Sequence, residues 1–344
     1  MPNIKDIAAR ANVSTATVSY VLNGKKSVSE KTRARVLQII EEMNYQPNLV
    51  AKSLKLKRTQ TIGVIVEDVT SFNSSEIIDG IHEYAEEQGF SILLTNIRVL
   101  KRIDHFYSKA DRVKELIPPA VKEIVNKQVD GLIYVGVHPR DVTGLIPDMQ
   151  IPIVYSYCYT NGADDYSVNY DDYQAAYEST EYLIRTGHKT IAVISGVMNS
   201  VPTKDRFNGY YQALNDNNLI FDPALIKTGD WEYESGHRSA LELLNMSPCP
   251  DAILAMNDNM AAGAVSACHS LGLKVPDDIS VVGFDDCEFS SYLTPSLTTM
   301  RLPLHEMGIE AVRTLITVLN EDSPVEHNKK LSCKLIERRS VKNR

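Results

Sequence analysis

Four apolar residues near the start of the chain repeat with the spacing of a helix. Ile4, Ile7, Ala8 and Ala11 fall at i, i+3, i+4 and i+7, which places them along one face. Asn3 stands directly before them, and asparagine is a favoured helix cap. The pattern therefore predicts a short amphipathic helix that begins after Asn3.

The next stretch, VSTATVSYVLNG, is rich in β-branched residues, yet its context predicts a second helix rather than a strand. Ser14 is a good N-cap, and Val18 and Leu22 share one face at i, i+4. The pair Asn23-Gly24 ends the segment, as expected after a helix.

A third helix is expected from Glu30 to Met43, after a cap at Ser29. Its inward residues would be Val36, Leu37, Ile40 and Met43. Two helices joined by a very short turn and followed by a third are typical of a helix-turn-helix unit, whose second helix lies in the major groove of DNA. We therefore predict an all-α DNA-binding domain over residues 1–46.

The outer face of the second helix would then contact DNA. The predicted base-reading residues are Thr15, Ala16 and Tyr20. The predicted phosphate contacts are Ser19, Asn23, Lys25, Lys26, Ser29 and Thr32.

Residues 47–60 are expected to form a hinge and linker. Pro47 ends the third helix, and Asn48 can cap a short helix that runs through Leu54. A helix this short is unstable alone in water, so it would fold only against a partner. We place Asn48, Ala51 and Leu54 at the DNA minor groove, with Leu54 as a wedge into a base step. A plain interdomain linker is the alternative.

From Thr61 onward, apolar runs alternate with helical patterns. The strand-like runs are TIGVIV, FSILLTN, DGLIYVG, IPIVYSY, TIAVISG, DAILAMND and ISVVGFDD. Continuous apolar strands indicate parallel sheets that helices cover on both faces. The number of units exceeds one sheet, so we expect an α/β body with two similar doubly wound lobes.

Polar residues follow several of these strands, at the sheet edge where ligands of such folds bind. The candidates are Ser71, Asn73, Arg206, Asn257, Asp285 and the sole tryptophan, Trp231. A carboxylate, an arginine and amides around one indole suit a sugar. Asp285 and Asp286 are adjacent at a strand end, so one should face the ligand and the other the scaffold.

Charge separates the two parts of the chain. Residues 1–58 carry eleven Lys and Arg against four Asp and Glu, a net charge of +7. Because the whole chain has a net charge of −8, the remaining residues carry a net charge of −15. A basic head on an acidic body suggests that only the head binds a polyanion. The sequence lacks the common catalytic, nucleotide-binding and metal-binding motifs, so we expect no enzyme, no cofactor and no metal. With no signal region or membrane span, we expect a cytoplasmic protein.

Taken together, the motifs IKDIAARANVSTATVSYVLNG, VSEKTRARVLQIIEEMNYQPNLVAKSL, DISVVGFDD and LTPSLTTMR closely resemble the LacI/GalR family of bacterial transcription regulators. The resemblance implies a homodimer whose paired heads bind a pseudo-palindromic operator. It also implies a body over 61–344, built like a periplasmic sugar-binding protein, with an effector between its lobes. By this resemblance the first lobe would comprise about 61–160 and 292–320, and the second about 161–291 and 321–344.

The resemblance also implies roles by position. Leu54 matches the family's minor-groove leucine, and Arg206, Asn257 and Asp285 match its ligand residues. Further positions in the effector pocket would be Asn73, Ser74, Tyr157 and Trp231, with Ser71 nearby. Three departures from the family pattern stand out. Tyr20 replaces a common arginine, Asn73-Ser74 replaces a phenylalanine pair and implies a more polar pocket, and the segment around 98–116 is longer than usual.

We therefore predict a sugar-responsive transcriptional regulator that acts as a repressor. A purine-like or other small-metabolite effector remains the alternative within the same class. A pure solute-binding protein is the rival from another class, although the basic head argues against it.

Overall fold

The amino-terminal unit is built from three helices: α1 (Ile4–Ala11), α2 (Thr15–Leu22) and α3 (Glu30–Glu42). The Asn3 side chain caps α1 and forms a capping box with Asp6, while Asn12 ends it in the left-handed conformation. Ser14 accepts a hydrogen bond from the Thr17 amide at 3.1 Å, which begins α2 as expected.

Apolar side chains from all three helices form the small core of this unit, which comprises Ile7, Ala8, Ala11, Val18, Val21, Val36 and Ile39. One expectation for α3 is wrong. Leu37 is 47% exposed, whereas Ile39 is buried. Val36, Ile40 and Met43 pack on the core as expected, so Leu37 is the one predicted inward residue that the structure contradicts.

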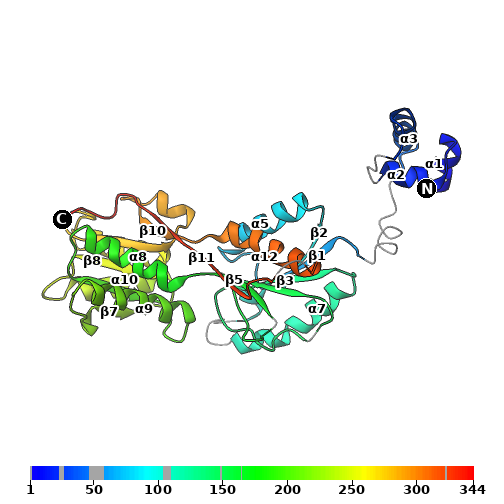
Figure 1. Cartoon of the computed structure of the whole chain (residues 1–344). Helices are drawn as coiled ribbons and strands as arrows, with labels where there is room; N and C mark the ends of the chain where they lie inside the picture. Colours follow the sequence, from blue (N-terminus) through cyan, green and yellow to red (C-terminus); the bar gives the residue numbers. More distant parts are fainter. Residues whose placement is uncertain are drawn as a thin grey trace. The chain divides into compact units, whose positions relative to one another are not determined.

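The computed structural model describes residues 2–22, 27–45, 58–103, 110–147, 149–163, 165–321 and 324–344. Residues 1–60 and 61–344 form separate units. The second unit contains two six-stranded sheets, one in each lobe, and Figure 1 shows the chain passing between them.

The sheet of the first lobe is entirely parallel and has the order β11-β5-β4-β3-β1-β2. Its strands are β1 (Thr61–Val66), β2 (Ser91–Asn96), β3 (Gly131–Val135), β4 (Ile153–Ser156), β5 (Tyr166–Tyr170) and β11 (Asn328–Leu331). Along β1, Ile62, Val64 and Val66 join one core cluster and Ile65 joins another. Alternating side chains thus bury both faces, as the continuous apolar run predicts.

Helices cover both faces of this sheet. On one face lie α5 (Ser74–Glu87) and α12 (Leu304–Leu319), and on the other lies α7 (Ile117–Val125) (Figure 1). A side chain at Gly80 of α5 would lie 2.1 Å from the carbonyl oxygen of His305, so only glycine permits this close helix approach.

The long segment after β2 contains α6 (Val99–Arg102) and the 3-10 helix η2 (Ala110–Glu115). Val99, Ile103 and Val113 are buried in the core cluster beneath α7. The described parts of this segment therefore pack into the first-lobe core on the α7 side of its sheet.

The sheet of the second lobe has the order β12-β10-β9-β8-β6-β7 and is parallel except for the antiparallel pair β10 and β12. Its strands are β6 (Ile191–Ser195), β7 (Ile226–Thr228), β8 (Ala252–Ala255), β9 (Ser280–Asp285), β10 (Thr298–Arg301) and β12 (Lys334–Ile336). Its helices are α8 (Asp172–Arg185), α9 (Val201–Asp216), α10 (Tyr233–Leu244) and α11 (Asp258–Ser270), with the short turns η3 (Pro223–Leu225) and η4 (Glu288–Ser291).

Sheet membership corrects three of the expected lobe boundaries. β5 belongs to the first lobe although it lies beyond residue 160, and β10 belongs to the second lobe although it lies beyond residue 292. β11 also belongs to the first lobe, beyond residue 321. The chain therefore crosses between lobes after β5, after β10 and after β11.

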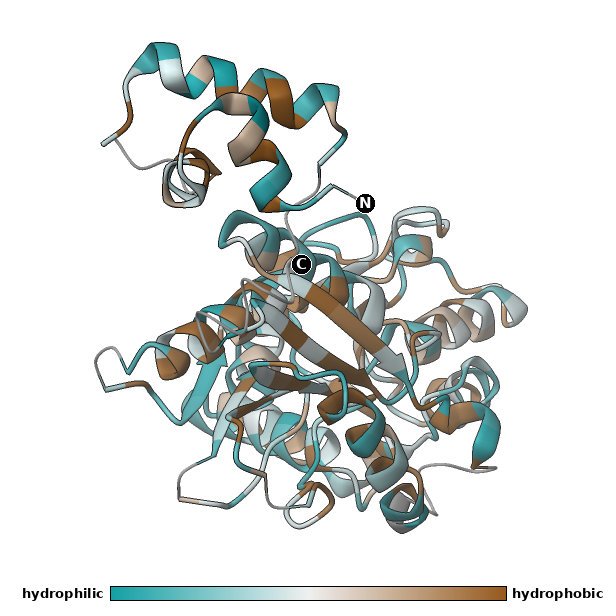
Figure 2. Ribbon diagram, turned by 90° about the vertical axis from the view of Figure 1, so that its right-hand side faces the viewer, coloured by the Kyte–Doolittle hydropathy of each residue, from teal (hydrophilic) through white to brown (hydrophobic). Residues whose placement is uncertain are grey.

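The hydropathy of the ribbon agrees with this layering. Apolar colouring concentrates on the central strands and on one side of the helices, while the outer faces are hydrophilic (Figure 2). Among the described residues, no helix combines the length and apolar character needed to span a bilayer.

Candidate effector and DNA-binding sites

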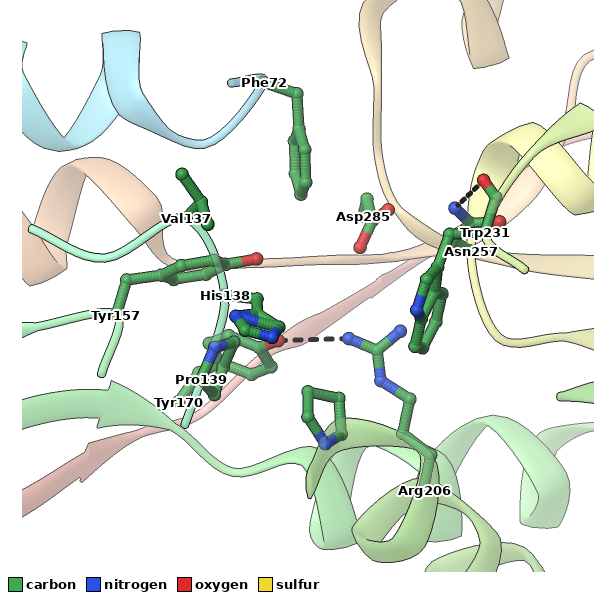
Figure 3. Close-up of a pocket in the computed structure, with 11 residues that line it drawn as sticks. Phe72, Val137, His138, Pro139, Tyr157, Tyr170, Arg206, Trp231, Asn257 and Asp285 are labelled. Atoms are coloured by element: carbon green, nitrogen blue, oxygen red, sulfur yellow. Dashed lines mark hydrogen bonds between the residues drawn. The ribbon is translucent and has the colours of Figure 1, made fainter. Parts of the chain in front are cut away.

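A pocket lies in the second unit at the carboxyl ends of the strands, between the two lobes (Figure 3). The first lobe lines it with Phe72, Val137, His138, Pro139, Tyr157 and Tyr170. The second lobe lines it with Pro202, Arg206, Trp231, Asn257 and Asp285. The structure therefore brings together five of the eight predicted effector residues, each from the segment at or after the end of a different strand.

Arg206 occupies the floor of this pocket and is almost completely buried. It projects from α9 and donates to Asp172 at 2.6 Å, to the hydroxyl of Tyr170 at 3.0 Å and to the carbonyl oxygen of Met256. Its guanidinium also lies 3.6 Å from the ring centroid of Phe284. Arg206 thus links the segment after β5, where the chain first passes between the lobes, to the end of β8 in the second lobe.

Asp285 and Asp286 divide their roles as their adjacent positions predict. Asp285 lines the pocket, where its carboxylate lies opposite the hydroxyl of Tyr157 (Figure 3). Asp286 instead pairs with Arg301 at 2.7 Å and with Arg338 at 2.6 Å. Within the described chain, no group donates a hydrogen bond to the Asp285 side chain, so this carboxylate is available to a ligand.

The environment of Asp285 disfavours its ionised form. Burial raises the pKa of Asp285 well above its usual range, and repulsion from Asp258 and Asp172 adds to the rise, although Arg206 opposes it. Burial also raises the pKa of Asp172 despite its ion pair with Arg206. Hydrogen-bond donors from a ligand would therefore relieve an unfavourable buried carboxylate.

The loop after β3 is held by a buried ion pair that the sequence interpretation missed. Glu67 is fully buried and accepts hydrogen bonds from Tyr134, from the Val137 amide at 3.0 Å and from Arg140. Although burial opposes ionisation, Arg140 lowers the pKa of Glu67. Burial, reinforced by Arg140, lowers the pKa of His138 to about 3, so His138 presents a neutral imidazole to the pocket. The only signal in the sequence was a run of polar residues, VHPRD, after a strand.

The loop after β1 differs from the expectation. Asn73 and Ser74 are fully buried, and they donate to the carbonyl oxygens of Gly136 at 3.1 Å and Asp68 at 2.7 Å. Ser71 is half-buried and donates to Asn73. Phe72 lines the pocket instead. The replacement of two phenylalanines by Asn73-Ser74 therefore leaves an aromatic ring at this side of the pocket and does not itself make the wall polar.

Among the residues that the structure describes, there is no group of three or more His, Cys, Asp or Glu side chains placed to hold a metal ion.

The predicted DNA-contacting residues fall into two sets. Thr15, Ala16 and Tyr20 are exposed on α2, and Ser19 is partly exposed. The Ser29 and Thr32 hydroxyls bond to each other at 2.9 Å, and Ser29 caps α3. The remaining predicted contacts lie outside the described residues; these are Asn23, Lys25, Lys26, Asn48, Ala51 and Leu54.

Comparisons with known proteins agree with both parts of this architecture. Residues 3–48 match the profile of bacterial regulatory proteins of the lacI family, and residues 180–341 match a periplasmic binding protein-like domain. The chain is 33% identical to the HTH-type transcriptional repressor PurR of Pasteurella multocida, with complete coverage of both chains. The chain belongs to the lacI family. This confirms the resemblance found in the sequence, and the protein is a DNA-binding transcriptional repressor.

Solved lacI-family structures share the fold. The lac repressor dimer bound to operator and the anti-inducer ONPF has a TM-score of 0.77 and 30% identity, covering 99% of each chain. A complex of the transcriptional regulator CelR with cellobiose has a TM-score of 0.67 and 28% identity, covering 99% of this chain and 100% of that one. The predicted helix-turn-helix head and two-lobed body are thereby confirmed.

Proposed function

We propose that the operator affinity of this repressor is controlled by a sugar or sugar derivative bound between the two lobes. The Asp285 carboxylate carries the proposal, because it faces the pocket near the Trp231 indole and accepts no hydrogen bond from the described chain. A carboxylate can accept from two neighbouring hydroxyls, and an indole face packs against the C–H face of a sugar ring. Arg206 adds donors, since its bonds to the described protein use three of its five N–H groups.

The electrostatics of the pocket favour a neutral effector. Asp172 and Asp285 act on the guanidinium of Arg206, and Asp258 lies close enough to Asp285 to repel it. Burial raises the pKa of each of these three carboxyls. An anionic effector would add negative charge to a site whose carboxyls already resist ionisation. Effector hydroxyls that donate to Asp285 favour its ionised form. Effector affinity should therefore rise with pH until Asp285 is ionised in the free protein.

An effector in this pocket would contact both lobes at once. Phe72 and Tyr157 come from the first lobe, and Trp231 and Asp285 come from the second. Bound effector would therefore favour one lobe angle through differential affinity for the two arrangements, typically worth about 1–3 kcal/mol. We propose that this change reaches the hinge at residues 47–60 and alters operator binding.

We further propose that the repressor binds its operator as a homodimer. The lac repressor, which shares the fold over nearly the whole chain, was solved as a dimer on its operator. Two copies of α2 would then read the half-sites of a pseudo-palindrome, with Thr15, Ala16 and Tyr20 on the exposed face. Selection from random DNA should enrich such a sequence, and enrichment of a motif with a single half-site would argue against binding as a homodimer.

Thermal-shift screening tests the effector class. The panel should contain neutral mono- and disaccharides, sugar phosphates, purine bases and nucleosides, because a bound ligand raises the melting temperature by mass action. We expect a neutral sugar to stabilise the protein and to change its affinity for the selected operator. Asp285→Asn should abolish both effects. Asp286→Asn is the matched control, since it removes the neighbouring carboxylate, which faces Arg301 and Arg338, and should keep the response.

A purine-like effector is the second candidate, favoured by one observation. Phe72 and Trp231 line the pocket from opposite lobes, and a planar base could lie between two aromatic rings (Figure 3). Stabilisation by bases or nucleosides alone would reject the sugar proposal in favour of this candidate.

A further inference from the structure

The main chain of Trp231 is held in an unusual conformation at the pocket wall. Its φ is +76°, a left-handed angle that is uncommon for a bulky residue and persists only where surrounding contacts enforce it. Those contacts are amide donors to its carbonyl oxygen, from Asn257 at 2.8 Å and from Asn259 at 3.5 Å. Figure 3 shows the Asn257 bond beside the pocket.

Asn257 uses both ends of its side-chain amide inside the protein. The nitrogen donates to Trp231, and the oxygen accepts from the Met260 amide at 2.9 Å and thereby caps α11. Asn257 is also only 7% exposed. Its geometry therefore fits a residue that positions Trp231 better than one that binds the effector directly, which modifies the role expected from the family resemblance.

The indole ring of Trp231 rests on the main chain of Gly196, immediately after β6. A Cβ atom at Gly196 would lie 2.0–2.4 Å from the Cζ2, Cη2 and Cε2 atoms of the ring, far closer than atoms can approach. Any side chain at residue 196 would therefore displace the indole. The pocket lies against the indole, and the Arg206 guanidinium stands 5.8 Å from its centroid. Displacement would thus change the room available to the effector.

We infer that Gly196 and Asn257 are positioning residues that recess the Trp231 indole and so set the width of the effector pocket on its second-lobe side. Gly196 allows the ring to lie back, and Asn257 fixes the peptide that carries it. The inference deepens the proposed function and rests on it for the effect on sugar binding. The recessed placement of the indole itself does not depend on any effector.

Fluorescence gives a direct test, because Trp231 is the only tryptophan in the chain. Gly196→Ala should shift the emission maximum and change acrylamide quenching. Asn257→Asp keeps an acceptor for the α11 cap but loses the donor to Trp231, so it should increase quenching. Each variant should also weaken binding of the sugar found by screening, roughly three- to tenfold, as expected for one well-placed aromatic contact.

Two matched controls separate these effects from general perturbation. Gly63→Ala adds the same methyl group to buried β1 of the other lobe, where the nearest atoms are side-chain ends at 3.1–3.3 Å. Asn245→Asp removes an amide donor bound to a carbonyl oxygen at 2.8 Å in the same lobe. Neither should alter Trp231 emission or quenching. Unchanged fluorescence in Gly196→Ala or Asn257→Asp would overturn the role assigned to that residue.

A double-variant cycle covers the case in which Gly196→Ala folds poorly. Phenylalanine lacks the outer part of the indole. Gly196→Ala should therefore lower the melting temperature much less in a Trp231→Phe background than in the natural chain. Additive losses would overturn the inference. If fluorescence and the cycle behave as expected but no sugar binds, the proposed function fails and the positioning role stands. If a sugar binds and fluorescence does not respond, the positioning role fails alone.

Discussion

The buried carboxyl of Asp258 should make the stability of the second lobe depend on pH. Asp258 begins α11 and accepts hydrogen bonds from the Cys287 amide at 2.9 Å, the Ser290 hydroxyl at 2.6 Å and the Thr299 hydroxyl at 2.6 Å. Burial raises its pKa to about 6, although these three bonds oppose the rise. The perturbation is Asp258→Asn, which removes the titrating group.

The sign and size of the effect follow from the two pKa values. The folded state holds the proton more tightly than the unfolded chain, in which the pKa is near the ordinary 3.8. The contribution of Asp258 to the free energy of unfolding is therefore complete below about pH 4 and is lost as pH rises through about 6. Since one pKa unit is worth about 1.4 kcal/mol, the loss should be roughly 3 kcal/mol.

Urea unfolding followed by Trp231 emission measures this lobe directly. The free energy of unfolding of the natural protein and of Asp258→Asn should be compared between about pH 4 and pH 7. Their difference should change by roughly 3 kcal/mol across this range. Asp222→Asn, at an exposed aspartate of the same lobe, is the control and should leave the pH profile unchanged. A constant difference between the natural protein and Asp258→Asn would refute the reasoning.

Three further predictions concern the other parts of the molecule. Leu54→Ala should weaken operator binding while effector affinity, measured by calorimetry, stays the same; unaltered gel-shift titrations would contradict the minor-groove assignment. Tyr20→Arg should move base preference toward guanine at one operator position, because arginine pairs bidentately with guanine, and random-sequence selection would reveal whether it does. Arg140→Met leaves Glu67 buried without its partner, so we expect a loss of about 3–5 kcal/mol in unfolding free energy, whereas a loss below 1 kcal/mol would argue against a buried pair.

Local signals predicted the head and the central strands well. Caps at Asn3 and Ser29 act through neighbouring amides, so their sequence spacing carries the structure. The long apolar runs became β1, β3, β6, β8 and β9, because a strand buried on both faces needs apolar residues throughout. The strands β5, β7, β11 and β12 are short and partly polar, and only pairing with a neighbour makes them strands.

The pocket was predictable where a strand end fixes the position of a residue. Asp285 directly terminates β9 and reached the pocket as expected. Phe72 and Asn73 lie in a turn beyond β1, where the sequence pattern does not determine which side chain faces the pocket. We predicted Asn73, but Phe72 lines the pocket and Asn73 is buried in the protein. The dual hydrogen bonding of Asn257 depends on the fold of a loop 26 residues away, which no local pattern encodes.

The last two strands of the chain, β11 and β12, each form one edge of a sheet, and this affects the order in which the protein can fold during synthesis. Residues 328–336 supply β11 to the first lobe and β12 to the second, and the fully buried Ser340 bonds to strands β9 and β10. On the ribosome, therefore, neither sheet gains its last strand until this segment has emerged. Until then, the edges of β5 and β10 stay open to pairing with other nascent chains. The three-helix head, whose contacts are local, can fold long before.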